Sequence, residues 1–174
     1  MFDISLYYEN FVLLGVYVVY INIFCAVGVI YSSRRVNSAL IVLLVIALFN
    51  LMMKYAQSEM TPMFDTHKEL IRHLWYLVFA TCWLSSVYVM IKIHELSDVE
   101  LGKFAKTVMF ANLSIGMLTL AKYIFRMHLE IDSPIINALY SFGINIMNVA
   151  IAALSLAISV TALWLNTSFF KRIR

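Results

Sequence analysis

Five long apolar stretches constrain this chain more than any other feature of its sequence. A helix that crosses a membrane needs about 20 consecutive, mostly apolar residues. Five segments meet this requirement, at residues 11–31, 36–55, 71–93, 104–127 and 135–165. None of them alternates apolar and polar residues as a strand of a membrane barrel does. The sequence therefore predicts an all-α fold, an integral membrane bundle of five transmembrane helices.

The connections between the apolar stretches are short, and the longest covers residues 57–70. They leave no room for a soluble domain, so residues 1–174 are predicted to form a single transmembrane helical domain. No basic segment precedes the first stretch, which follows Asp3 and Glu9 and has the length of a full span. We therefore expect it to stay in the membrane as a signal anchor.

The charged residues predict the orientation of the bundle, because lysine and arginine favour the cytoplasmic side. Eight of the 13 lysines and arginines fall on one side of the predicted spans: Arg34, Arg35, Lys92, Lys103, Lys106, Lys171, Arg172 and Arg174. The acidic residues gather on the other side. We therefore expect the N-terminus outside and the C-terminus in the cytoplasm. The expected location is the plasma membrane, specifically a bacterial inner membrane, and the net charge of +3 does not indicate nucleic-acid binding.

Small and polar residues follow one face of the last apolar stretch at alternating spacings of four and three. This predicted helix-packing seam consists of Ser141, Asn145, Asn148, Ala152, Ser155 and Ser159. Small side chains let membrane helices approach closely, and asparagines hydrogen-bond across such interfaces. Three interpretations stay open. The seam packs against the protein's own helices, contacts another subunit, or lines a water-filled path.

A second pattern gathers cationic and imidazole side chains near the predicted outer ends of the spans. The candidate ligand-binding residues are Lys54, Arg72, His73, Lys122, Arg126 and His128. Charged groups inside spans are costly and often mark functional sites. Three interpretations stay open here as well. The side chains reach lipid headgroups, pair with acids of the outer loops, or form a site for an anionic ligand, lipid headgroup or partner carboxylate.

The favoured function is a non-enzymatic small integral membrane subunit or accessory protein of a larger assembly. Its predicted partners are membrane lipid and, through the last helix, either other membrane subunits or a second copy of the chain. An enzyme is the least favoured class. The sequence predicts no catalytic residues, because no Ser-His or Cys-His pair has diagnostic spacing and no paired carboxylates lie within a span.

Two alternative functions stay open. A small oligomeric transporter or channel would use one face of the fourth span: Asn112, Gly116, Thr119 and Lys122. A haem-carrying electron-transfer subunit would use His73 and His128. These histidines fall at the outer ends of adjacent antiparallel spans, where two imidazoles can ligate the iron of haem b. Apart from this alternative, the sequence predicts no cofactor and no metal site.

Overall fold

The computed structural model describes the backbone of residues 4–32, 36–131 and 133–171, and the side chains of residues 17–32, 36–131 and 133–164. Within these ranges the chain forms five α-helices and no strand. In chain order they are α1 (Ile4–Ser32), α2 (Ser38–Met63), α3 (Lys68–Leu96), α4 (Lys103–Tyr123) and α5 (Pro134–Lys171). A short π-helical turn, η1 (Ile124–His128), continues α4. The predicted all-α fold is confirmed.

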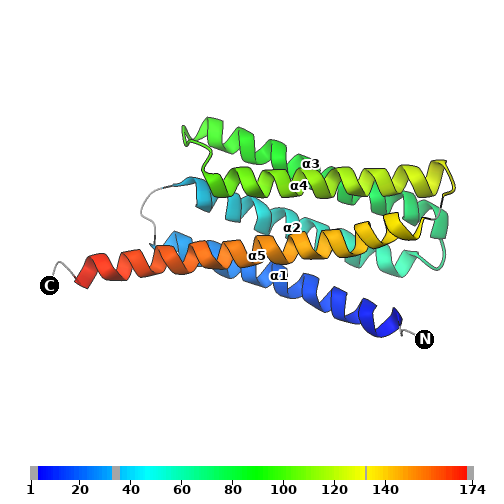
Figure 1. Ribbon diagram of the computed structural model, residues 1–174, viewed down its shortest axis with the longest axis horizontal. Helices are drawn as coiled ribbons and strands as arrows, with labels where there is room; N and C mark the ends of the chain where they lie inside the picture. The colour runs from blue at the N-terminus through cyan, green and yellow to red at the C-terminus, as the bar shows by residue number, and fades with distance from the viewer. Residues whose placement is uncertain (1–3, 33–35, 132, 172–174) are drawn as a thin grey trace.

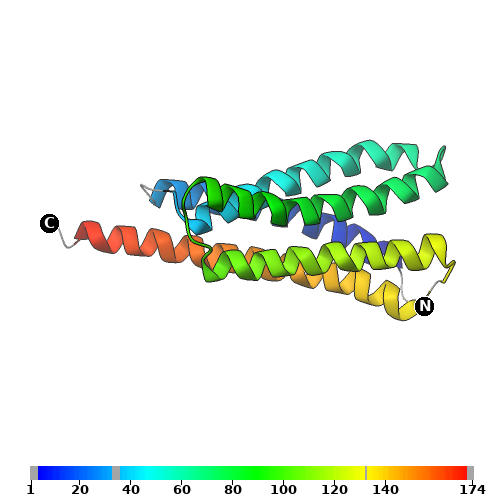
Figure 2. The same cartoon turned by 90° about the horizontal axis from the view of Figure 1, so that it is seen from above.

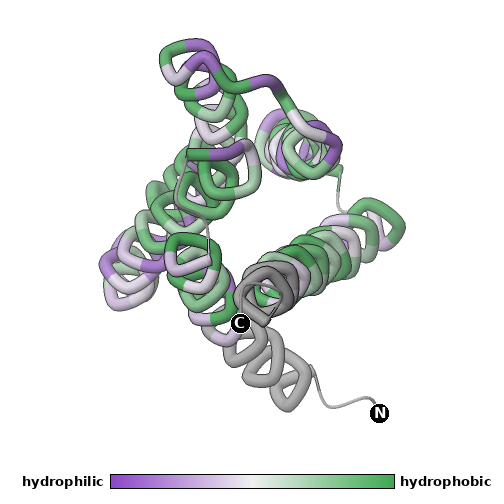
Figure 3. Tube along the Cα trace, turned by 90° about the vertical axis from the view of Figure 1, so that its left-hand side faces the viewer, coloured by the Kyte–Doolittle hydropathy of each residue, from purple (hydrophilic) through white to green (hydrophobic). Residues whose placement is uncertain are grey.

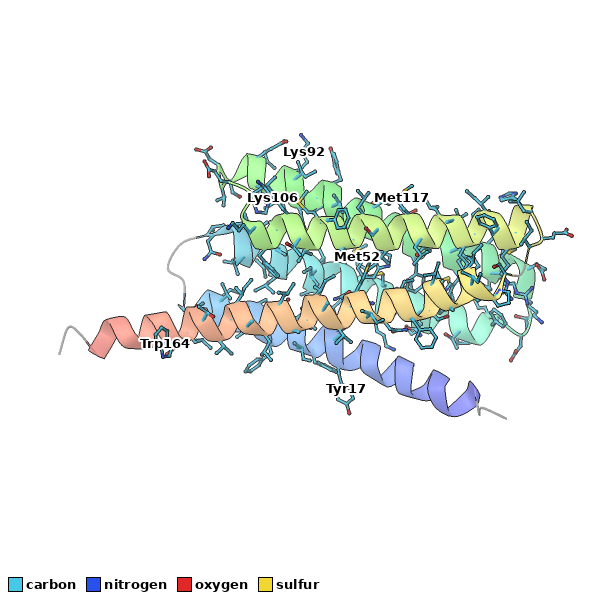
Figure 4. All side chains as sticks on the ribbon, in the orientation of Figure 1. Tyr17, Met52, Lys92, Lys106, Met117 and Trp164 are labelled. Carbon is cyan, nitrogen blue, oxygen red and sulfur yellow. The ribbon has the colours of Figure 1, made fainter. Side chains whose placement is uncertain are left out.

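Four helical segments are long and apolar enough to cross a membrane: Ser38–Met63, Lys68–Leu96, Lys103–His128 and Pro134–Trp164. In α1 the side chains are described only from Tyr17, and the apolar segment Tyr17–Ser32 is shorter than a full span. Exposed apolar side chains such as Tyr17, Met117 and Trp164 lie on the outside of the bundle (Figure 4). A helical bundle with apolar side chains on its outside is the architecture of a multi-pass membrane protein.

Two helices run further than the sequence predicted. The second ends at Met63 rather than near residue 55, because the intervening residues include the good helix formers Ala, Gln, Glu and Met. The outer connection therefore shrinks to residues 64–67. The last helix has 38 residues, and at 1.5 Å per residue it measures about 57 Å, well beyond a ~30 Å apolar core. Its C-terminal end projects past the ends of the other helices (Figures 1 and 2).

The five helices form a closed ring. Each helix packs against the next one in the chain, and α5 packs back against α1. A view along the bundle shows this arrangement (Figure 3). Short connections make consecutive helices antiparallel, as in other up-and-down bundles, whereas α1 and α5 run parallel (Figure 1). Because α2 and α4 also contact each other across the ring, the centre of the ring is closed over part of its length.

The apolar core is unevenly distributed along the ring. Its main cluster lies where α2 and α4 begin, and includes Ile41, Val42, Val45, Met90 and Val108. The opposite half holds only a small cluster among the described residues, made of Met53, Trp83 and Ile115. We call these the inner half and the outer half, following the predicted orientation. The outer half is the part of the bundle where space remains between the helices.

Candidate functional site

The outer half of the ring contains a cavity of about 330 Å³. Cavities that bind small molecules in proteins usually measure roughly 300–1,000 Å³. All five helices contribute side chains to the lining, and most of these come from α2, α3 and α5. The cavity therefore lies between the helices and also opens to the outside of the bundle, because its lining includes the exposed Ser141.

One wall of the cavity is aromatic and comes from α3. Trp75, Phe79 and Trp83 line it, and their spacing of four residues places all three on one face of the helix. The rings of Trp75 and Phe79 lie with their centroids 4.8 Å apart. Tyr140 of α5 adds a fourth ring to the lining. Together these rings offer an apolar surface about two helical turns long.

The facing walls are polar and come from α2 and α5. The polar side chains of α2 are Asn50, Lys54 and Gln57, and those of α5 are Ser141, Asn145 and Asn148. In both helices the spacing of four and three residues holds the polar groups on one face. The cavity therefore has an aromatic side and a side with hydrogen-bond donors and acceptors.

Lys54 gives the described lining of the cavity a positive charge. Among the described residues that line the cavity, it is the only one charged at neutral pH, and no aspartate or glutamate takes part. The side chain is half-buried. The two ion pairs found among the described residues, Arg72–Glu69 and Lys92–Glu95, do not involve it. An ammonium group among apolar side chains is stabilised by an anion beside it.

Lys122 is a second cation close to the same cavity. It is only 7% exposed, and its Nζ lies 4.2 Å from the centroid of the Tyr140 ring. This distance is typical of a cation–π interaction. The ammonium of Lys122 contacts a cavity-lining ring without lining the cavity itself. Tyr140 therefore contacts Lys122 and also lines the cavity.

The other predicted ligand-binding residues gather around Tyr123 or on the surface. The Nδ1 atom of His73 lies 3.1 Å from the Tyr123 hydroxyl, and the His128 ring packs edge-on against the same tyrosine at 5.2 Å between centroids. Arg72 pairs with an exposed glutamate on its own helix, and Arg126 is exposed. The predicted cation cluster therefore lies partly at the cavity and partly around Tyr123. The Tyr76 ring contacts both Tyr123 and the cavity-lining Tyr140, at 6.2 and 5.9 Å between centroids. The phenol ring lies against both imidazoles, and haem ligation stays a prediction.

The predicted transport face on α4 packs against α3. Asn112 donates a hydrogen bond from Nδ2 to Ser86 Oγ at 2.9 Å. A Cβ atom added to Gly116 would meet Leu84 Cδ2 at 2.9 Å, so α3 and α4 approach closely at this point. Of this face, Thr119 alone reaches the cavity lining.

The predicted seam of α5 has two different environments. Its first three residues, Ser141, Asn145 and Asn148, line the cavity, whereas the other three are buried. In the buried part, Ser159 donates a hydrogen bond to the carbonyl of Cys25 in α1 at 3.1 Å. The buried part of the seam therefore faces the protein's own helices, whereas the first three residues face the cavity.

Two features of the site were not predicted from the sequence. The aromatic wall on α3 was visible as residues spaced four apart, but it resembled the interfacial aromatic belt that many spans carry. Asn22 is fully buried in α1, yet a single asparagine in an apolar stretch gives no sign of which way it points.

Comparisons with family models, with curated proteins and with solved structures find no match to this chain. The arrangement of the cavity is therefore the basis for assigning a function.

Proposed function

We propose that this protein is a non-enzymatic membrane subunit or accessory protein that binds an anionic ligand with an apolar portion in the outer cavity. One observation carries the proposal. Lys54, a cation without an ion pair among the described residues, lines a cavity of ligand size opposite an aromatic wall. Few well-placed polar groups within an apolar pocket are the usual composition of a small-molecule site.

The positive charge of Lys54 and the aromatic wall of α3 indicate which kind of ligand fits the cavity. A carboxylate or phosphate beside Lys54 balances the ammonium group in a region of low dielectric. An alkyl or ring portion of the ligand covers Trp75, Phe79 and Trp83 and removes apolar surface from water. Both an anionic lipid and a free organic anion have this chemistry, and the experiment below separates them.

The last helix supports a role within an assembly. The C-terminal end of α5 extends beyond the other helices (Figure 2), and the described connections between helices are short. A projecting helix can pack against a partner without disturbing the ring. Native mass spectrometry of the tagged chain, released from its own membranes in mild detergent, tests this role. Different chains in the complex support it, and a monomer or a homo-oligomer contradicts it.

Ligand binding is tested by quenching tryptophan fluorescence with bromooctyl phosphate, because bromine quenches an indole on contact. Trp75 and Trp83 line the cavity, whereas Trp164 is exposed near the other end of the bundle (Figure 4). We expect saturable quenching in wild type, and Trp164→Phe should leave this quenching in place. Lys54→Met should weaken the binding roughly tenfold, because a hydrogen-bonded charged pair contributes a little over ~1 kcal/mol.

The matched control is Lys106→Met, which removes an exposed lysine at the opposite end of the bundle (Figure 4). Equal loss of affinity in both lysine variants would contradict the proposal, as would quenching by bromooctylammonium that equals quenching by the phosphate. Repeating the measurement with brominated phosphatidic acid in nanodiscs separates the two sources. Quenching by this lipid identifies a lipid ligand, and quenching by the soluble phosphate alone identifies a free anion.

A further inference from the structure

A second, smaller cavity beside the outer cavity is lined by asparagine side chains from four helices. A small cavity of about 10 Å³ is lined by Asn22 of α1, Asn50 of α2, Asn112 of α4 and Asn148 of α5. It shares Asn50 and Asn148 with the outer cavity. We call this group of four residues the asparagine floor. Four amides that meet in the middle of a membrane bundle are costly unless they have partners.

Two residues of the asparagine floor have polar atoms without partners among the described residues. Asn22 is 0% exposed, and no described residue forms a hydrogen bond with its Nδ2 or its Oδ1 atom. Asn112 is 1% exposed and donates to Ser86 Oγ, but its Oδ1 atom has no partner within the described part of the chain. A buried polar atom without a partner costs about 1–3 kcal/mol. Such atoms are rare in folded proteins and call for an explanation.

The unpartnered atoms include a donor as well as acceptors, and this limits what can bind. A metal cation satisfies only the oxygens, and an anion satisfies only the amide N–H groups. A group that both donates and accepts, such as a hydroxyl, an amide or a water molecule, satisfies all of them. The size agrees, because a cavity of roughly 10–15 Å³ holds about one water-sized group.

We infer that the asparagine floor is a subsite for one uncharged donor–acceptor group of the ligand. The inference rests on the proposed binding of an anion at Lys54. Asn50 lies four residues deeper than Lys54 on the same face of α2, about 6 Å along the helix at 1.5 Å per residue. The ligand therefore carries a carboxylate or phosphate at one end, a hydroxyl or amide at the other, and an apolar portion between them.

The test compares octanoate with ω-hydroxyoctanoate as competitors of bromooctyl phosphate. These two acids differ only by the terminal hydroxyl, and the chain is long enough to reach from Lys54 to the floor. In wild type we expect the hydroxy acid to bind more tightly. In Asn22→Leu we expect the ratio of the two dissociation constants to shift by roughly tenfold toward octanoate, because the hydroxyl loses its buried partner.

Asn145→Leu is the matched control. It removes an amide that lines the outer cavity but already donates to the Ser141 carbonyl of its own helix at 2.6 Å. This variant is expected to change both dissociation constants together and to leave their ratio unchanged. Asn22→Ala removes the same amide as Asn22→Leu with a smaller side chain, and it replaces the leucine variant if that variant does not fold.

The outcomes separate this inference from the proposed function. If both acids bind in a manner that depends on Lys54 but the ratio is the same in wild type and in Asn22→Leu, the floor subsite is wrong and the anion site stands. If neither acid displaces the bromooctyl phosphate, or Lys54→Met has no effect on either, the proposed function fails and the subsite fails with it. A shift in the ratio that appears equally in Asn145→Leu also overturns the subsite.

Discussion

Gly116→Ala is expected to destabilise the bundle, although the same change is usually favourable in a helix. Gly116 lies on α4 where that helix packs against α3. A Cβ atom at this position would meet Leu84 Cδ2 at 2.9 Å, Leu84 Cγ at 3.0 Å and Trp83 Cβ at 3.4 Å. The Leu84 side chain can turn away only by rotating about its Cα–Cβ bond, and the Cβ atom of Trp83 moves only with the helix.

The magnitude follows from two opposing effects. Replacing glycine by alanine inside a helix stabilises it by about 0.5–1 kcal/mol. Forcing a methyl group into a packed interface costs about 1–3 kcal/mol. We therefore expect a net loss of ~1 kcal/mol for Gly116→Ala. Because Trp83 lines the outer cavity, the same displacement is expected to weaken ligand binding.

Gly28→Ala is the matched control for this prediction. A Cβ atom at Gly28 would lie 3.7 Å from Leu163 Cδ1 and 4.0 Å from Ser159 Cβ, which are ordinary contact distances. Gly28→Ala should therefore stabilise the helix as alanine usually does, without forcing a methyl group against a neighbouring helix. Unfolding in mixed detergent micelles, followed by circular dichroism, measures both changes. If Gly116→Ala stabilises the protein as much as Gly28→Ala does, the close approach of α3 and α4 is wrong.

Three further predictions concern other parts of the bundle. Ser38→Ala removes a hydroxyl that accepts a hydrogen bond from the Gly102 amide at 3.0 Å and lies 2.9 Å from His94 Nε2. Unfolding measurements should show that the free energy of unfolding falls by about 1–3 kcal/mol, because the Gly102 N–H and the His94 Nε2 atom both lose this partner. Arg72→Ala breaks an exposed pair with Glu69 on the same helix, and the same measurement should show less than about 1 kcal/mol. A reporter fused to the C-terminus should read as cytoplasmic, and an external reading would reverse the predicted orientation.

The helices were predictable because their signal is carried by many residues at once. A stretch of 20 or so apolar residues has few alternatives to a spanning helix, and the predicted last stretch begins within one residue of Pro134, the first residue of α5. The ends of helices are harder to predict, and α2 is an example because it ends at Met63 rather than near residue 55. The polar residues after position 55 are typical of a loop, but they continue the helix beyond the apolar segment.

The site was only partly predictable, because helical spacing gives the face of a residue but not its neighbour. Lys54 and Asn148 were both predicted to be functional, but their sequence spacing could not show that they line one cavity. His73 and Lys122 are predicted to share a site; the structure places His73 against Tyr123 and Lys122 over Tyr140, and both of these rings contact Tyr76. Such pairings depend on the order of helices in the ring, which no single helix encodes.

The position of the asparagine floor favours binding over passage through the membrane. Ile46 and Ile151 line the small floor cavity and also belong to the main apolar cluster of the inner half. Polar lining therefore changes directly to packed aliphatic side chains at this depth. A ligand that moved further inward would lose every hydrogen bond offered by the floor, and α2 and α4 would have to separate to let it pass. In this conformation the space between the helices ends at the floor, and transport would require a second packing of the inner half.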